Sequence, residues 1–265
     1  HQRLCFAVAL WNGKDPILKE RLFGLSNPEG NHGEDVKECY WHLDNTPTHS
    51  YMRYLYRYPQ AEFPYHALVA ENARRGPHEP EFELTDTGVF AESRYFDVEV
   101  EYAKADADDV LARIRITNRG PDEAELHAIP TLWFRNEWRW RAGRPRPSIV
   151  PADENTVIAD HATLGWRYVQ ASGAPELLFT ENDSNNARLF KARNTSLYVK
   201  DAFHRYLIRG ESEAVARDGG TKCGFLYRFD VASGQTVEIR FRLHDYSGHA
   251  PVDGPEFDAV FDARK

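Results

Sequence analysis

Residues 95–134, YFDVEVEYAKADADDVLARIRITNRGPDEAELHAIPTLWF, decide the fold of this chain. Three runs rich in aliphatic and aromatic residues lie within this stretch, at Tyr95–Tyr102, Val110–Asn118 and Glu125–Phe134. Apolar and polar residues alternate in much of these runs, which is typical of strands that bury one face. Turn-forming residues at Asn118–Glu123 separate the last two runs. The stretch therefore predicts consecutive antiparallel strands joined as in a meander.

The same pattern continues outward in both directions. Further strand-like runs, bounded by Gly, Pro, Asn and Asp, bring the total to about a dozen. The clearest of them are Arg3–Trp11, Val36–Leu43, Ser50–Tyr58, Lys222–Asp230 and Thr236–Leu243. A second turn is expected at Ala232–Gln235, and helical signals are confined to Pro64–Arg75 and Glu256–Lys265. We therefore expect an all-β, antiparallel sandwich with a few short helices and long loops.

Composition and charge limit the class of protein. The chain has 265 residues, 42% of them hydrophobic and 13% aromatic, which is enough to form a full core. Its formal net charge of -8 repels nucleic-acid phosphates and anionic lipid, so neither nucleic acid nor a membrane is an expected partner. No apolar run approaches the roughly 20 residues that span a bilayer. The widely spaced cysteines favour reduced thiols and a cytoplasmic location.

Functional side chains are most concentrated at residues 31–65, where histidines, carboxylates and aromatic rings follow one another closely. Two strand-like segments flank the turn DNTPT at residues 44–48, so about half of the rings should face the core. The polar remainder is predicted to form a docking surface or the rim of a substrate pocket. Its members are Glu34, Asp35, Lys37, His49 and Arg53.

The same run offers metal ligands but no metal-site motif. Imidazoles and carboxylates that could coordinate a cation are present at His32, Glu34, Asp35, His42, Asp44 and His49. Neither an HExxH sequence nor paired Cys/His spacing accompanies them, so we expect solvated or hydrogen-bonded side chains and no metal. The glycines of Pro28–Gly33 precede a strand rather than a helix, which argues against a phosphate loop. No cofactor is expected.

A second cluster, WFRNEWRWRAGRPRP at residues 133–147, mixes tryptophans with arginines. Trp138 and Trp140 are predicted to share one face of a strand. Flat indoles stack on the apolar faces of sugar rings, and aromatic residues together with Arg anchor protein interfaces. We therefore expect a carbohydrate or interdomain contact at these two residues, with burial in the core as the alternative.

Several long phrases resemble a known family. They are GNHGEDVKECYWHLDNTPTHSYMRYLYRYPQAEFPY at 30–65, ELTDTGVFAESRYFDVEVEYAKA at 83–105, LHAIPTLWFRNEW at 126–138 and TENDSNNARLF at 180–190. With these phrases the chain resembles the N-terminal region of large bacterial proteins of the glycoside hydrolase family 63 type. The resemblance implies a β-supersandwich followed by an (α/α)6 barrel that hydrolyses an α-glucosidic bond with inversion. Both catalytic carboxylates of that family belong to the barrel, so no catalytic residue is expected here.

The resemblance also sets the expected organisation and role of the chain. Residues 1–255 would be the supersandwich without its native N-terminus, and residues 256–265 would begin a linker helix to the catalytic domain. The chain would then be a non-catalytic domain of a glucosidase-like protein, packed on the (α/α)6 domain of the same polypeptide and shaping its substrate pocket.

Two other functions stay open. The first is an aldose-mutarotase-like sugar epimerase, because supersandwich folds also support sugar epimerisation by a His and a Glu acting as acid and base. The candidates for those roles are His32, His49 or His66 with Glu34 or Glu38. The second is a carbohydrate-binding module that uses Trp138 and Trp140, with Arg139 as a hydrogen-bond donor to sugar hydroxyls.

Overall fold

The structure is a computed structural model that describes residues 2–20, 38–140, 143–245 and 251–265. Its strands are β1 (Leu4–Trp11), β2 (Cys39–Asn45), β3 (Tyr51–Pro59), β4 (Tyr95–Asp106), β5 (Asp109–Asn118), β6 (Ala124–Phe134), β7 (Ser148–Pro151), β8 (Thr156–His161), β9 (Gly165–Ala171), β10 (Glu176–Thr180), β11 (Lys222–Val231) and β12 (Thr236–His244). The α-helices are α1 (Tyr65–Arg74), α2 (Asn186–Phe190), α3 (Ala202–Arg209) and α4 (Pro255–Arg264).

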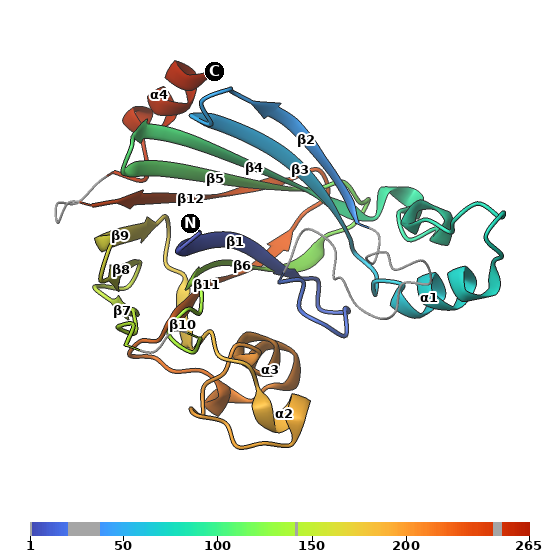
Figure 1. Ribbon diagram of the computed structural model, residues 1–265. Helices are drawn as coiled ribbons and strands as arrows, with labels where there is room; N and C mark the ends of the chain where they lie inside the picture. Colours follow the sequence, from blue (N-terminus) through green and yellow to red (C-terminus); the bar gives the residue numbers. More distant parts are fainter. Residues whose placement is uncertain (1, 21–37, 141–142, 246–250) are drawn as a thin grey trace.

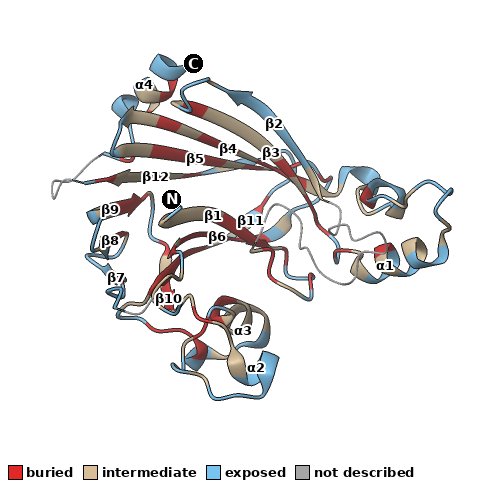
Figure 2. Ribbon diagram, in the orientation of Figure 1, coloured by how far each residue is buried: buried red, intermediate tan, exposed pale blue. Residues whose placement is uncertain are grey.

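The strands form two antiparallel sheets that face each other (Figure 1). One sheet has four strands in the order β1-β6-β11-β10, and the other has eight in the order β2-β3-β4-β5-β12-β9-β8-β7. The largest cluster of buried side chains draws on both sheets (Figure 2). The predicted all-β, antiparallel supersandwich with a few short helices is therefore confirmed.

Alternation along the strands builds the core, as β4 illustrates. Phe96, Val98 and Val100 are fully buried in the cluster between the sheets. The intervening Asp97 and Glu99 must point to the opposite, outer face of the eight-stranded sheet, because successive side chains of a strand alternate. Each fully buried apolar side chain contributes about 1.5–3 kcal/mol relative to exposure. The alternation quoted from the sequence is thus what fixes which face of the sheet is buried.

The meander expected at the turns Asn118–Glu123 and Ala232–Gln235 is wrong, because each turn joins strands of different sheets. β5 belongs to the eight-stranded sheet and β6 to the four-stranded one, so the first turn crosses between the sheets. The second turn likewise crosses from β11 back to β12. A meander would keep neighbouring strands paired in one sheet, whereas here the chain changes layers at both turns.

Asn118 holds both crossings together. Its fully buried side chain donates hydrogen bonds from Nδ2 to the carbonyl oxygens of Asp122 (2.8 Å) and Val231 (2.7 Å). Its Oδ1 accepts from Gln60 Nε2 (2.6 Å) and from the backbone N–H of Gly120 (2.8 Å). All four hydrogen-bonding positions of the amide are therefore used at one corner of the sandwich.

Helices cover the outer faces of the two sheets. Phe203 of α3 packs with Ala9 and Ile129 on the outer face of the four-stranded sheet, and α4 lies on one end of the eight-stranded sheet (Figure 1). The predicted helices Pro64–Arg75 and Glu256–Lys265 are found as α1 and α4. Among the described helices, none has the length and apolar character needed to cross a bilayer.

The eight-stranded sheet is assembled from separate parts of the chain. β12, the last strand in sequence, lies between β5 and β9 and so joins β2–β5 to β7–β9. The predicted strand Val36–Leu43 is found as Cys39–Asn45, and residues 36–37 lie outside the described part of the chain. All three cysteines are free thiols, as the sequence predicts.

A group of buried charges lies at the end of β3. Lys19 is 1% exposed, and its Nζ lies 2.5 Å from Glu38 Oε1 and 3.4 Å from the centre of the Phe63 ring. Nearby, Asp15 Oδ2 accepts a hydrogen bond from the Tyr58 hydroxyl at 3.0 Å. Burial raises the pKa of Asp15 to about 6, and attraction to Lys19 and the Tyr58 hydrogen bond offset only part of this rise.

Replacing Asn118 tests the importance of the corner. We expect Asn118→Ala to lower the free energy of unfolding by about 3 kcal/mol, because the substitution leaves buried donors and acceptors without partners. Thr117→Ala is the matched control, since Thr117 is on the same strand but makes one exposed hydrogen bond, to Thr236. We expect it to cost about 0.5 kcal/mol. Urea titrations measure both changes, and equal losses would contradict this assignment.

The buried Asp15 predicts a pH dependence of stability. Folding raises its pKa from 3.8 to about 6, so its contribution to stability is complete below 3.8 and is lost as the pH rises through about 6. Acidification from pH 7.5 to 5 should therefore add about 1 kcal/mol through this group. Asp15→Asn should lack this increment in urea titrations at the two pH values, while Asp218→Asn, at an exposed site, should keep it. An identical pH dependence in wild type and Asp15→Asn would contradict the prediction.

Candidate functional site

A groove with a volume of about 620 Å³ is lined by residues of the edge strand β1 of one sheet and of β2, β3 and β4 of the other. Its aromatic lining is Phe6, Tyr54, Tyr102 and Trp133. Its polar and charged lining is Glu20, His42, Asp44, Asn45, His49 and Arg53. Two residues predicted from the sequence, His49 and Arg53, are thus brought together in one site.

Strand register brings part of the lining to one face of the eight-stranded sheet. His42 of β2 pairs with Tyr54 of β3, and Tyr102 of β4 pairs with Met52 of β3. The register shifts between His42 and Asp44, so that Asp44, and not Leu43, pairs with Arg53. This irregularity redirects the edge strand, as bulges commonly do near functional sites.

The turn between β2 and β3 places His49 at the rim of the groove. Thr46 Oγ1 accepts hydrogen bonds from the backbone N–H groups of Ser50 (3.0 Å) and Tyr51 (3.1 Å). His49 has a left-handed backbone conformation with φ of 52°, and its Nδ1 lies 3.1 Å from Asn45 Oδ1. The imidazole is exposed, so it can reach a ligand in the groove.

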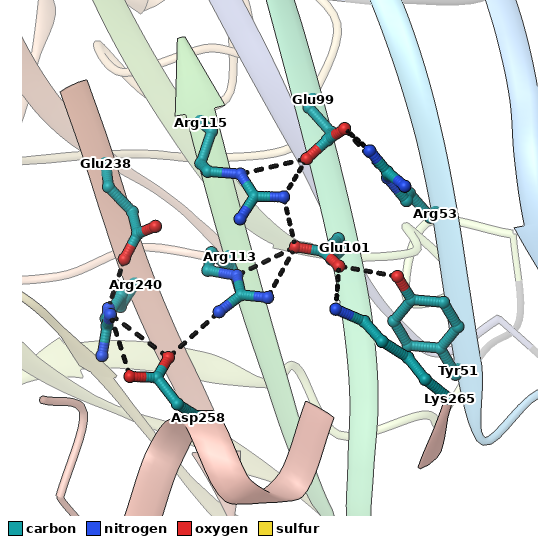
Figure 3. A network of polar contacts seen from close by, with 10 residues as sticks. All are labelled: Tyr51, Arg53, Glu99, Glu101, Arg113, Arg115, Glu238, Arg240, Asp258 and Lys265. Atoms are coloured by element: carbon teal, nitrogen blue, oxygen red, sulfur yellow. Dashed lines mark hydrogen bonds and ion pairs between the residues drawn. The ribbon is translucent and has the colours of Figure 1, made fainter. Parts of the chain in front are cut away.

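Arg53 connects the groove to a ladder of charges on the outer face of the eight-stranded sheet (Figure 3). Its guanidinium forms an ion pair with Glu99, which also binds Arg115. The ladder continues from Glu101 through Arg113 to Asp258 of α4. Asp258 in turn pairs with Arg240 of β12, which also pairs with Glu238. Arg53 therefore has a carboxylate partner already, and its role at the groove is chiefly to form the wall.

Two carboxyl groups in the ladder keep their negative charge. Burial by itself would raise the pKa of Glu101, but hydrogen bonds from Tyr51 and Arg113 outweigh it and lower the pKa to about 2. Burial is likewise outweighed at Glu99 by hydrogen bonds from Arg115 and Arg53, and the pKa is lowered. Glu99 and Glu101 are therefore ionised at neutral pH.

The other predicted site residues do not join the groove. Glu34, Asp35 and Lys37 lie outside the described part of the chain. Trp138 and Trp140 lie in a turn rather than in a strand, which corrects the expected strand face. Trp138 packs against the main core, whereas Trp140 is 84% exposed.

The residues proposed for sugar epimerisation are not brought together either, because Glu38 is buried and His66 is exposed. Glu38 is 2% exposed at its side chain and bound to Lys19 and to the Tyr56 hydroxyl, whereas His66 lies exposed on α1. His32 and Glu34 lie outside the described residues. Arg139, proposed as a hydrogen-bond donor to sugar hydroxyls, forms an ion pair with Asp183 at 3.3 Å.

Several residues that line the groove were not predicted from the sequence, among them Glu20, Tyr102 and Trp133. Trp133 carried a usable signal, because its neighbours Leu132 and Phe134 are core residues and strand alternation sends Trp133 to the other face. Alternation likewise places Tyr102 on the same face of β4 as Phe96, Val98 and Val100. Glu20 carried no such signal, since its approach to the groove depends on tertiary packing. Within the described residues, no group of three or more His, Cys, Asp or Glu side chains is placed to hold a metal ion.

Comparison with known proteins finds a relative in sequence and a neighbour in structure. No protein-family model matches the chain. The uncharacterized protein YMR196W of Saccharomyces cerevisiae is 40% identical across 100% of this chain, which spans 28% of the length of that protein. A polysaccharide lyase is a structural neighbour with a TM-score of 0.39 and 9% identity, covering 94% of this chain and 26% of the lyase.

Proposed function

We propose that this chain is a non-catalytic β-sandwich domain of a glycoside hydrolase with α-glucosidase-like activity. In this proposal the domain packs on an (α/α)6 catalytic domain of the same polypeptide, and its groove contacts the sugar that the catalytic domain holds. The observation that carries the proposal is the lining of the groove, where aromatic rings from both sheets stand beside imidazole, amide and carboxylate groups.

The lining suits the two kinds of surface on a sugar ring. Aromatic rings such as Tyr54, Tyr102 and Trp133 offer flat apolar faces on which the C–H face of a pyranose can stack. Asp44 and His49 offer hydrogen-bonding groups for hydroxyls at the rim. Ligand sites generally combine a mainly apolar lining with a few polar groups that fix orientation.

A non-catalytic role is supported by the carboxylates of the groove. Glycoside hydrolysis needs two carboxyl groups acting as acid and as base or nucleophile. Among the described lining residues, the carboxylates are Glu20 and Asp44, and Glu20 lies 2.5 Å from the ammonium of Lys222. Within the described lining, Asp44 therefore has no unpaired second carboxylate beside it.

The remaining length of the yeast relative supports a partner domain. This chain spans 28% of that protein, so the remainder is long enough for a separate catalytic domain. The resemblance to the family 63 type suggests that such a domain is an (α/α)6 barrel, with the catalytic acid and base on its residues.

Ligand titration of the chain tests the groove. We expect maltotriose to bind, and we expect His49→Ala and Asp44→Asn each to weaken binding about fivefold to tenfold through the loss of a hydrogen bond. Isothermal titration calorimetry measures the affinities. The matched control is His78→Ala, which removes an exposed histidine from outside the groove and should bind as wild type does.

Two further results would contradict the proposal. Binding that survives both groove substitutions but is lost in Trp140→Ala would favour the exposed indole, and hence a carbohydrate-binding module. Hydrolysis of p-nitrophenyl α-glucoside by this chain well above the buffer rate would contradict the non-catalytic role. We expect hydrolysis at the buffer rate.

A further inference from the structure

A second pocket, of about 410 Å³, lies on the outer face of the four-stranded sheet. Trp133 of β6 pairs with Lys222 of β11, so both side chains lie on the same face, and Thr131 is two residues from Trp133 on that face. Leu132 and Cys223, which alternate with them, are buried in the core on the other side. Asn182, Lys200 and Asp201 complete the lining together with Glu20.

The second pocket shares part of its lining with the groove. Glu20 and Trp133 line both, and no other residue is common to the two sets. Phe6 and Ala7 of the edge strand β1 belong to the groove side. The two depressions therefore adjoin at Trp133 and Glu20.

The polar groups of the second pocket are largely fixed before any ligand arrives. The Lys222 side chain is 9% exposed, and its Nζ lies 2.5 Å from Glu20 Oε1 and 3.0 Å from the carbonyl oxygen of Lys200. Asn182 donates its side-chain N–H to the carbonyl oxygen of Phe134 at 2.8 Å. Asp201 pairs with Arg188 at 3.4 Å. Preorganised groups of this kind lower the cost of ordering side chains on binding.

The mixture of charges points to a neutral, polyhydroxylated ligand. Lys200 and Lys222 supply donors, and Glu20 and Asp201 supply acceptors within the same lining. Hydroxyl groups both donate and accept, so a sugar can use both kinds. A carboxylated sugar would be repelled by the two carboxylates of the pocket as well as attracted by its two ammonium groups. Its charge would therefore add little to its binding free energy.

We infer that the groove and the second pocket form one extended site for a linear oligosaccharide, with Trp133 stacking a sugar unit where they meet. The inference rests on the proposed function of the groove and adds to it the length of the ligand. A single monosaccharide would use only one of the two depressions, whereas an oligosaccharide would use both and gain contacts with each added unit.

Calorimetric titration with methyl α-glucoside, maltose, maltotriose and maltotetraose tests the inference. We expect the association constant to rise along the series in the wild-type chain. Lys200→Met and Asp201→Asn should reduce the affinity for the longest oligosaccharide about fivefold to tenfold and leave that for methyl α-glucoside unchanged. Lys200 is exposed, so its variant keeps the fold even where Asp201→Asn perturbs α3. Asp218→Asn, at an exposed site outside both depressions, is the control.

The outcomes separate this inference from the proposed function. Binding that is weakened by Asp44→Asn but does not depend on length would overturn the extended site and leave the groove intact. A rise in affinity with length that persists unchanged in Lys200→Met and Asp201→Asn would also overturn it. No binding of any sugar in the series would overturn both the proposed function and the inference.

Discussion

The hydrogen bonds of Asn118 fix the relation between the two sheets, and the remaining architecture depends on that relation. Its side chain binds the chain at Asp122, just beyond β5, and at Val231, the last residue of β11. Its backbone N–H and carbonyl bond to Gln235 and Gly234 of the second crossing turn, each at 3.0 Å. One buried amide therefore sets where the chain leaves one layer and where it returns. Buried polar groups that are fully satisfied in this way favour a single arrangement over alternatives.

The eight-stranded sheet uses its two faces differently. Its inner face supplies the core and part of the groove, whereas its outer face carries the ladder from Arg53 to Glu238. Partly exposed ion pairs of the ladder contribute little individually, typically about 0–1 kcal/mol. Burial of Phe257 and Phe261 of α4 is worth more, at about 1.5–3 kcal/mol each. Apolar packing therefore provides most of the energy that holds α4 on the sheet, and the charges fix its orientation.

Much of the fold was accessible from the sequence, because alternation of residues such as Phe96, Val98 and Val100 is a local signal. The layer change at Asn118 was not, since turn-forming residues indicate that the chain reverses but not which sheet it enters. For the site, His49 and Arg53 were found because they are polar residues in an aromatic run. Trp138 was misplaced because it alternates with arginines as a strand residue would, whereas β6 has already ended at Phe134 and the chain turns at Trp138. Glu20 reaches the groove only through tertiary packing.

The central position of β12 has a consequence for how the chain matures on the ribosome. Until Thr236–His244 has left the exit tunnel, β2–β5 and β7–β9 have no strand between them, and β5 and β9 expose unpaired backbone groups. Contacts between β12 and β5 join segments more than 100 residues apart, and such distant contacts form slowly. The nascent domain thus depends on its last strand, and a chain released early would present two open sheet edges to chaperones and to other nascent chains.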